Sequence, residues 1–216
     1  MAFGRRKVRA SDRTGTPTDL LVVGLGNPGE KYEGSRHNAG ADVVHLLAER
    51  HGAKLRGGKF NSLVDEVRIG EHRVALAIPL TYYNEAGLAV RALAKRHGLP
   101  AADADTGETS WNTLVVLHDE MDLEPGRIKL KFGGGLAGNN GLKSIVGHIH
   151  TQDFTRVRIG IGKPPGRQSG ADHVLRRPGK SEKAELDIAM QHAADAVEAI
   201  LTDGLEPAMN HYNQSS

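Results

Sequence analysis

Short apolar runs alternate with longer amphipathic segments from residue 18 to the C-terminus. Their periodicity predicts strands at 20–25, 60–69, 72–78, 113–118, 127–132 and 156–161, and helices at 38–51, 84–98, 140–150 and 181–201. In the second helix, Leu88, Val90 and Leu93 are expected to face inward. This order predicts an α/β fold over 18–216, a single-domain three-layer α/β/α arrangement with a twisted mixed central sheet.

The composition fits one medium-sized domain, because 216 residues with 38% hydrophobic content can bury a sizeable core. Cysteine is absent, which excludes a disulfide framework, a thiolate metal site and a thiol nucleophile. No apolar stretch approaches the roughly 18 residues of a membrane-spanning helix, and the N-terminus lacks the apolar middle of a signal peptide. We therefore expect a cytoplasmic protein that makes no membrane contact.

Charge is distributed unevenly along the chain, although the net charge is only +2. Residues 1–17 are basic and lack hydrophobic periodicity, which predicts a disordered N-terminal arm. Within the body, 125–168 carries eight basic residues against a single aspartate, whereas 181–216 carries seven acidic residues and one lysine. A basic segment in an acidic body favours a polyanionic partner such as nucleic acid, but charge alone leaves open a solvated face balanced by the acidic helix.

The sequence 24–29, GLGNPG, satisfies the G-x-G-x-x-G pattern of dinucleotide-binding loops. That site needs a helix that begins at the third glycine and an acidic residue about 20 positions later, at the end of a second strand. Here the next helix is not expected before Asn38, and Asp42 and Glu49 fall inside it. A nicotinamide or flavin site is therefore the less favoured interpretation.

Polar residues follow two of the predicted buried strands, at the edge where open α/β sheets place their ligands. Asn27 and His37 follow the first strand, and Asp119 lies at the end of the strand that begins at Thr113. An aspartate can hold a histidine ring in the tautomer needed for base catalysis. A metal site built from 118–122 is the rival, although its spacing matches no zinc pattern.

Two further segments place asparagines at predicted helix starts. They are TYYNEAG at 81–87 and GGGLAGNNG at 133–141. Taken alone, both asparagines are ordinary helix caps. The sequence contains neither a P-loop nor a G-x-S-x-G nucleophile elbow, so a serine-hydrolase interpretation lacks its nucleophile.

Five segments in this order resemble bacterial-type peptidyl-tRNA hydrolase: 24–40, 81–87, 118–126, 133–144 and 156–164. The likeness spans about 19–204. It implies a monomeric, metal-free and cofactor-free esterase that cleaves peptidyl-tRNA and recycles tRNA from aborted translation. A noncatalytic RNA-binding protein of the same fold is the alternative.

The resemblance also implies roles for individual residues. His37 would activate water as general base, Asp119 would stabilise its basic form, and Asn27 would distinguish blocked from free aminoacyl-tRNA. Asn84 and Asn140, aided by Tyr32 and Tyr82, would hold the substrate's ester end. The candidates for phosphate contacts, chosen by charge and likeness, are Lys129, Lys131, Lys143 and Arg156.

The chain departs from the family pattern at two places. The glycine loop usually resembles GGGHGGHNG, so Asn139 replaces a common histidine and Leu136-Ala137 is less polar. Tyr83 stands where methionine is usual and is expected to narrow an apolar wall. Neither departure is expected to touch His37, Asp119, Asn27, Asn84 or Asn140, so activity is expected.

Overall fold

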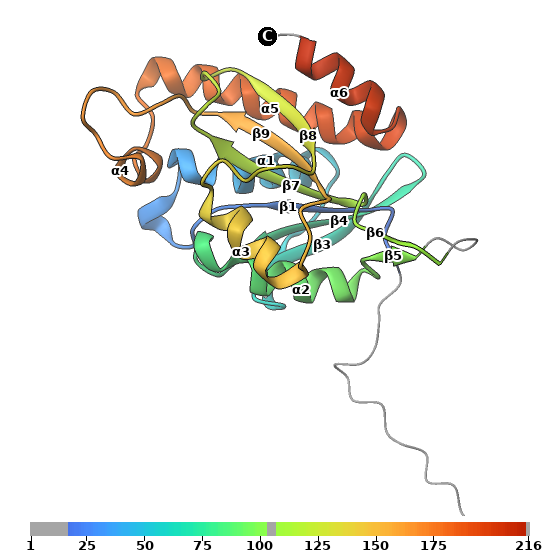
Figure 1. Ribbon diagram of the computed structural model, residues 1–216. Coiled ribbons are helices and arrows are strands. Elements are labelled where there is room, and N and C mark those ends of the chain that lie inside the picture. The colour runs from blue at the N-terminus through green and yellow to red at the C-terminus, as the bar shows by residue number, and fades with distance from the viewer. Residues whose placement is uncertain (1–16, 103–106, 215–216) are drawn as a thin grey trace, which may run out of the picture.

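The computed structural model describes residues 17–102 and 107–214 (Figure 1). Its strands are β1 (Leu20–Gly24), β2 (Arg56–Lys59), β3 (Ser62–Ile69), β4 (His72–Pro79), β5 (Ala101–Ala102), β6 (Thr109–Ser110), β7 (Leu114–Glu120), β8 (Ile128–Phe132) and β9 (Thr155–Gly160). Its α-helices are α1 (Ala39–Arg50), α2 (Ala86–Arg96), α3 (Asn140–Ile149), α4 (Gly170–Leu175), α5 (Lys180–Thr202) and α6 (Leu205–Gln214), and its 3-10 helices are η2 (Glu30–Tyr32), η3 (Arg36–Asn38) and η4 (Tyr83–Glu85). The predicted basic arm lies outside the described residues except for Pro17.

The central sheet has seven strands in the order β2-β3-β4-β1-β7-β9-β8. Strand β1 pairs in parallel with β4 and β7, and β7 pairs in parallel with β9. The two ends of the sheet are antiparallel, through the β2-β3-β4 meander and the β8-β9 pair. The predicted mixed sheet is therefore confirmed.

Helices cover both faces of this sheet, which confirms the three-layer prediction (Figure 1). On one face, α1 and α5 pack together and α6 lies against β8. Their buried side chains, such as Val44, Leu47 and Val197, form one half of the core. On the opposite face, α2 and α3 pack together and bury Val90, Leu93 and other apolar residues in the second half.

Some details of the elements differ from the sequence prediction. Leu88 is 52% exposed rather than buried, because a residue two positions before Val90 projects from nearly the opposite side of an α-helix, whereas Ala86, Val90 and Leu93 share the buried face. Helices α4 and α6 were not predicted. The first has only six residues. The second is short and polar overall, although Leu205, Ala208, Met209 and Tyr212 do recur at helical spacing.

Two glycines set the distance between α1 and the sheet. A Cβ atom at Gly40 would lie 2.2 Å from the carbonyl oxygen of Leu117 in β7, and one at Gly24 would lie 2.2 Å from the carbonyl oxygen of Gly40. Real Cβ atoms do not approach that closely. The absence of side chains at these positions therefore lets the start of α1 sit directly on the carboxyl ends of β1 and β7.

Candidate active site

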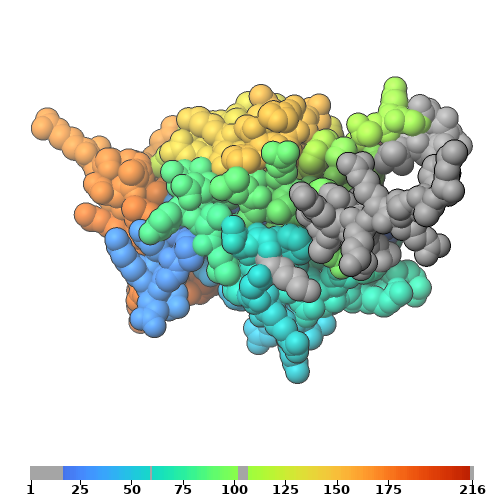
Figure 2. Space-filling view, turned by 90° about the horizontal axis from the view of Figure 1, so that it is seen from below, coloured from blue at the N-terminus to red at the C-terminus, as the bar shows by residue number. Residues whose placement is uncertain are grey.

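A cavity of about 390 Å³ opens at the carboxyl end of the parallel strands. It is lined by Asn27, His37, Tyr82, Tyr83, Asn84, Asp119, Glu120, Met121, Ala137, Gly138, Asn139, Asn140, Gly170, Ala171, Val174 and Leu175. In Figure 2 the blue, green, yellow and orange segments that supply this lining gather at one end of the molecule. Segments far apart in the sequence therefore converge where the strand pattern predicted a site.

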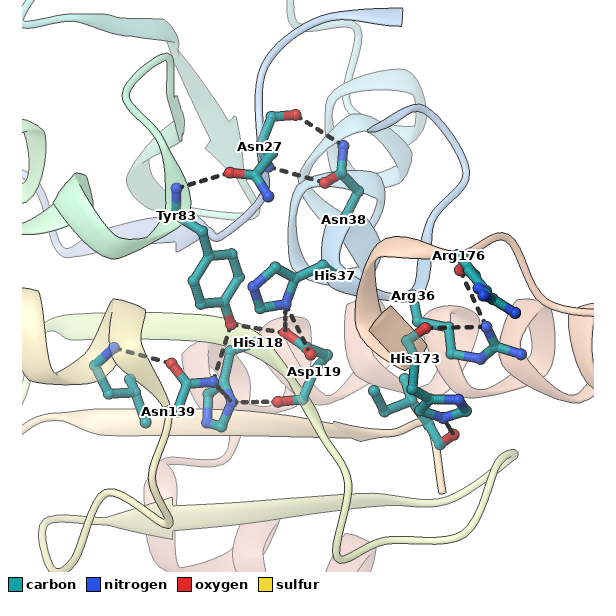
Figure 3. A network of polar contacts seen from close by, with 12 residues as sticks. Asn27, Arg36, His37, Asn38, Tyr83, His118, Asp119, Asn139, His173 and Arg176 are labelled. Atoms are coloured by element: carbon teal, nitrogen blue, oxygen red, sulfur yellow. Dashed lines mark hydrogen bonds and ion pairs between the residues drawn. The ribbon is translucent and has the colours of Figure 1, made fainter. Parts of the chain in front are cut away.

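The structure brings His37 and Asp119 together at the cavity (Figure 3). His37 Nδ1 lies 2.9 Å from both carboxylate oxygens of Asp119. An ionised carboxylate only accepts hydrogen bonds, so Nδ1 carries the proton and donates it. This tautomer leaves the lone pair on Nε2 of His37, which is the atom that can accept a proton from water.

Asp119 is ionised in spite of its burial. Its carboxylate side chain is only 4% exposed, and burial alone would raise its pKa. The nearby charge of His37, the hydrogen bond from His37 and the hydrogen bond from Tyr83 outweigh this effect and hold the pKa of Asp119 below its ordinary value. Asp119 therefore remains a hydrogen-bond acceptor across the neutral pH range.

Asn27 is fixed in one orientation by its neighbours. Its backbone N–H donates to Asn38 Oδ1 at 2.9 Å, and Asn38 Nδ2 donates back to the Asn27 carbonyl at 3.1 Å. Asn27 Oδ1 accepts a hydrogen bond of 2.9 Å from the backbone N–H of Tyr83. The Nδ2 group of Asn27 is thus the part of this side chain left to donate to a ligand. Asn38 was not predicted as a site residue, although the reciprocal pairing marks it as a support for Asn27.

The prediction that the two departures stay clear of the reactive residues is wrong. The Tyr83 hydroxyl donates a 2.7 Å hydrogen bond to Asp119, and the Tyr83 ring stacks on His37 with centroids 3.5 Å apart. Asn139 Nδ2 in turn donates to the Tyr83 hydroxyl at 3.0 Å. Tyr83 therefore contacts the base, its aspartate and, through its backbone, Asn27.

The other predicted substrate residues are placed less uniformly. Tyr82, Asn84 and Asn140 all line the cavity and are exposed to an incoming ligand. Tyr32 lies on η2, outside the cavity lining, with the Lys31 ammonium 5.1 Å from its ring centroid. The structure therefore brings three of these four side chains together.

The predicted phosphate contacts divide into two groups. Lys129 and Lys131 are half-buried on β8, and Lys143 is exposed on α3, where its Nζ lies 3.4 Å from Asn140 Oδ1. Arg156 is only 2% exposed, and its guanidinium donates to the carbonyls of Gly134 and Gly135 at 2.8 and 2.9 Å. The structure does not support a phosphate contact by Arg156; its geometry is that of a support for the glycine loop.

Arg36 is a residue whose role the sequence did not reveal. Its side chain is buried, pairs with Glu182 of α5, and donates to the backbone carbonyls of His173 and Arg176 (Figure 3). These contacts tie η3, which carries His37, to the α4 segment, which supplies Val174 and Leu175 to the cavity wall. A buried arginine satisfied by carbonyls and a carboxylate is stable in this position.

A second cavity of about 340 Å³ lies on the other side of Asn27 and contains Asp42 of α1. Burial raises the pKa of Asp42 from 3.8 to about 6; Lys183 opposes the rise, whereas Asp187 and Glu33 add to it. Ionisation of Asp42 is therefore harder in the folded chain than in the unfolded chain. The free energy of unfolding that this ionisation takes away grows as the pH rises from about 4, and it reaches its full value above 6.

Replacing Asp42 with asparagine is expected to remove this cost and raise the free energy of unfolding by ~1–2 kcal/mol at pH 7.5. At pH 4, where Asp42 is protonated in the folded protein, the gain in the free energy of unfolding should be only a small fraction of its value at pH 7.5. Urea unfolding of both proteins at the two pH values checks this. An equal gain at both, or destabilisation at pH 7.5, would contradict the assignment.

The residues of the rival metal site are engaged elsewhere. His118 Nδ1 donates to the carbonyl of Asp119, Glu120 pairs with Arg158 at 3.0 Å, and Asp122 lies 3.4 Å from Lys163. Among residues 17–102 and 107–214, no group of three histidine, cysteine or acidic side chains could hold a metal ion. The same residues contain no helix long and apolar enough to cross a membrane.

The chemistry of the lining defines a class of enzyme. Among the described residues that line the cavity there is no serine, threonine, cysteine or lysine, and its two carboxylates are engaged with His37 and Arg158. The lining does contain a histidine in the base tautomer, an aspartate that holds it, and asparagine amides that can bind carbonyl oxygens. This is the arrangement of a hydrolase that activates water directly.

Comparisons with known proteins agree with this class. The family model for peptidyl-tRNA hydrolase matches residues 21–216. The chain is 46% identical to a peptidyl-tRNA hydrolase of Frankia alni, over 93% of this chain and 98% of that one, and 48% identical to one of Mycobacterium marinum, over 88% and 95%. It also resembles the crystal structure of peptidyl-tRNA hydrolase from Acinetobacter baumannii, with a TM-score of 0.81 and 36% identity over 92% of this chain and 97% of that one. The chain belongs to the peptidyl-tRNA hydrolase family.

Proposed function

We propose that this protein hydrolyses the ester bond of peptidyl-tRNA, with His37 as the general base that activates water. The single observation that carries the proposal is the contact of His37 Nδ1 with both oxygens of Asp119, in a cavity lined by Asn27, Asn84 and Asn140. The family match supplies the substrate class.

The reaction balances without a covalent intermediate. His37 Nε2 takes a proton as water attacks the ester carbonyl, and Asp119 stabilises the resulting imidazolium. The tetrahedral intermediate then collapses, the bond to the ribose oxygen breaks, and that oxygen receives the proton held by His37. The products are a peptide carboxylic acid, which loses its proton to bulk water at neutral pH, and tRNA with a free terminal hydroxyl. A positioned base contributes about 10²–10⁴-fold to such a reaction.

The asparagines fit distinct parts of the substrate. Asn84 and Asn140, exposed at the cavity, can donate amide hydrogens to the oxyanion and to peptide carbonyls. Asn27 has its Oδ1 occupied by the Tyr83 N–H, so it presents Nδ2 as a donor. A donor suits the carbonyl of a blocked amino group and opposes the ammonium of a free aminoacyl ester, which supports Asn27 as the discriminator.

The polynucleotide part of the substrate would meet the basic residues near the cavity. Lys129 and Lys131 lie on β8 opposite Arg158 and Arg156. Arg158 is already paired with Glu120, but the four cations together still make this edge of the sheet attractive to phosphates. Contacts to phosphates suit an enzyme that acts on many tRNAs, since they carry no base information. The proposal places the protein in the cytoplasm, where translation occurs. It also treats the protein as a monomer, because one chain supplies the whole lining.

Replacing Lys131 with alanine is expected to raise KM for a tRNA ester about 3- to 10-fold while leaving kcat unchanged. The slope of log affinity against log salt concentration should also become less steep, by an amount that corresponds to about one counterion fewer released on binding. Steady-state kinetics between 50 and 200 mM salt would measure both. Lys54→Ala, which removes a charge from the loop after α1, is the matched control and should change neither value. An unchanged salt slope in the Lys131 variant would contradict the phosphate contact.

The proposed reaction is tested by incubating the protein with N-acetyl-aminoacyl-tRNA in the presence of EDTA. Release of the N-acetyl amino acid at the same rate with and without EDTA supports hydrolysis of the ester without a metal ion. Binding of tRNA without any ester cleavage would overturn the proposal and leave a noncatalytic RNA-binding protein of this fold.

A further inference from the structure

Tyr83 lies at the centre of the polar network in the cavity (Figure 3). It is 3% exposed, and its hydroxyl donates to Asp119 Oδ1 at 2.7 Å. Its ring lies parallel to the imidazole of His37, with an interplanar angle of 12° and a centroid distance of 3.5 Å. One side chain thus contacts both members of the His37–Asp119 pair.

Asn139 fixes the direction in which the Tyr83 hydroxyl donates. Its Oδ1 accepts the backbone N–H of Leu142 at 3.0 Å, which caps α3 and determines the orientation of the amide. Its Nδ2 then donates to the Tyr83 hydroxyl at 3.0 Å. Since an N–H group can only donate, the phenol must accept from Asn139 and send its own hydrogen to Asp119. The result is a directed chain of donors from Asn139 through Tyr83 to Asp119.

We propose that Tyr83, oriented by Asn139, is a positioning residue for the His37–Asp119 pair. Its hydroxyl binds one oxygen of the carboxylate, and its ring sets the plane of the imidazole. The inference rests on the proposed function of His37 as the general base. Tyr83 and Asn139, two of the positions at which the sequence departs from the usual family pattern, contact each other.

The hydrogen bond from Tyr83 also limits how strongly Asp119 stabilises a protonated His37. It withdraws charge from the carboxylate, so less remains for the imidazolium. The titratable neighbours of the pair, besides Tyr83 on η4, are His118 and Glu120 on β7, and Arg156 of β9 acts on His118. Removing only the hydroxyl should therefore make His37 easier to protonate, whereas the ring contact remains.

The first test is Tyr83→Phe, which keeps the ring and removes the hydroxyl. For N-acetyl-aminoacyl-tRNA, kcat is expected to fall about 3- to 30-fold with little change in KM, because the loss of the hydrogen bond that positions Asp119 outweighs its stronger attraction for protonated His37. The acidic limb of the pH–kcat profile should move up by about half to one pH unit. Tyr212→Phe on α6 is the matched control, because Tyr212 also contacts a histidine ring, that of His211, but lies away from the cavity. An unchanged kcat and an unmoved acidic limb in Tyr83→Phe would overturn the proposal.

The second test is Asn139→Ser, which keeps a helix-capping oxygen and removes the amide donor. It should change kcat in the same direction as Tyr83→Phe but less strongly. The double variant should be no worse than Tyr83→Phe, because Asn139 acts through a hydroxyl that is already gone. If the two effects multiply in the double variant, the linkage between the two residues is overturned. The single Asn139→Ser variant still tests the proposal if Tyr83→Phe does not fold.

A measurement without substrate separates this inference from the proposed function. The imidazole nitrogen resonances of His37, followed by NMR against pH, should titrate at higher pH in Tyr83→Phe than in the unaltered protein. If the unaltered protein cleaves no ester, the proposed function fails while this titration still tests Tyr83. Identical titration curves for the two proteins would contradict the positioning role whatever the activity.

Discussion

Alanine at position 37 is expected to lower kcat for N-acetyl-aminoacyl-tRNA by about 10²–10⁴-fold, the contribution of a positioned general base. In the proposed mechanism, His37 provides the lone pair that accepts the proton of the attacking water, and its contact with Asp119 keeps this lone pair on Nε2. Alanine cannot accept a proton. The affinity for tRNA should change little, because the basic residues that would contact phosphates lie on other elements. Single-turnover hydrolysis and equilibrium binding of deacylated tRNA measure the two effects separately.

His192→Ala is the control for the His37 variant, because His192 is exposed on α5 and does not line the cavity. It should retain full activity. A His37→Ala protein that turns over as fast as the unaltered enzyme would refute His37 as the base. A His37→Ala protein that also loses tRNA affinity would show that the histidine contributes to binding and not only to chemistry.

Alanine at position 40 is expected to destabilise the protein by about 3 kcal/mol or more, which for a chain of this size lowers Tm by ~6–12 °C. Its methyl group would lie 2.2 Å from the Leu117 carbonyl oxygen and 2.9 Å from the backbone nitrogen of Leu25. These are backbone atoms of the sheet and cannot rotate away. Helix α1 must therefore move off β7, which carries Asp119, so the contact between His37 and Asp119 should lengthen and activity should fall as well.

Gly147→Ala is the matched control for this substitution. Gly147 lies within α3, and a Cβ atom added there meets nothing within 4 Å. Alanine is the better helix former, so this variant should be neutral or slightly more stable. Thermal unfolding of the two variants beside the unaltered protein measures the difference. Equal Tm values for Gly40→Ala and the unaltered protein would contradict the close approach of α1 to β7.

The sequence predicted the partnership of His37 and Asp119 for a physical reason. Both residues follow apolar runs that form neighbouring parallel strands, and the carboxyl ends of such strands meet at one edge of the sheet. The same reasoning placed Asn27 near the cavity, and it depended on strand order, which hydrophobic periodicity encodes well. Asn84 and Asn140 alone resembled ordinary helix caps, so only the family resemblance assigned them to the site.

Contacts that depend on the direction of a side chain could not be predicted from the sequence. Nothing in TYYNEAG distinguishes Tyr82, which is 57% exposed, from Tyr83, which is buried against His37. The 3-10 turn η4 decides which ring enters the cavity. Arg36 was similarly hidden, because its partners lie more than 130 residues away in the α4 and α5 segments. Arg156 was chosen as a phosphate contact because of its charge, but its burial depends on how the glycine loop packs over it, which the sequence does not show.

The central claim is that this cavity hydrolyses a blocked aminoacyl ester of tRNA by direct activation of water. It is tested most directly by measuring, side by side, the rates of hydrolysis of N-acetyl-aminoacyl-tRNA and of free aminoacyl-tRNA carrying the same amino acid. The account predicts rapid cleavage of the blocked substrate and little cleavage of the free one, because Asn27 presents a donor where the free substrate carries an ammonium group. Equal rates on both substrates, or cleavage of neither, would contradict it.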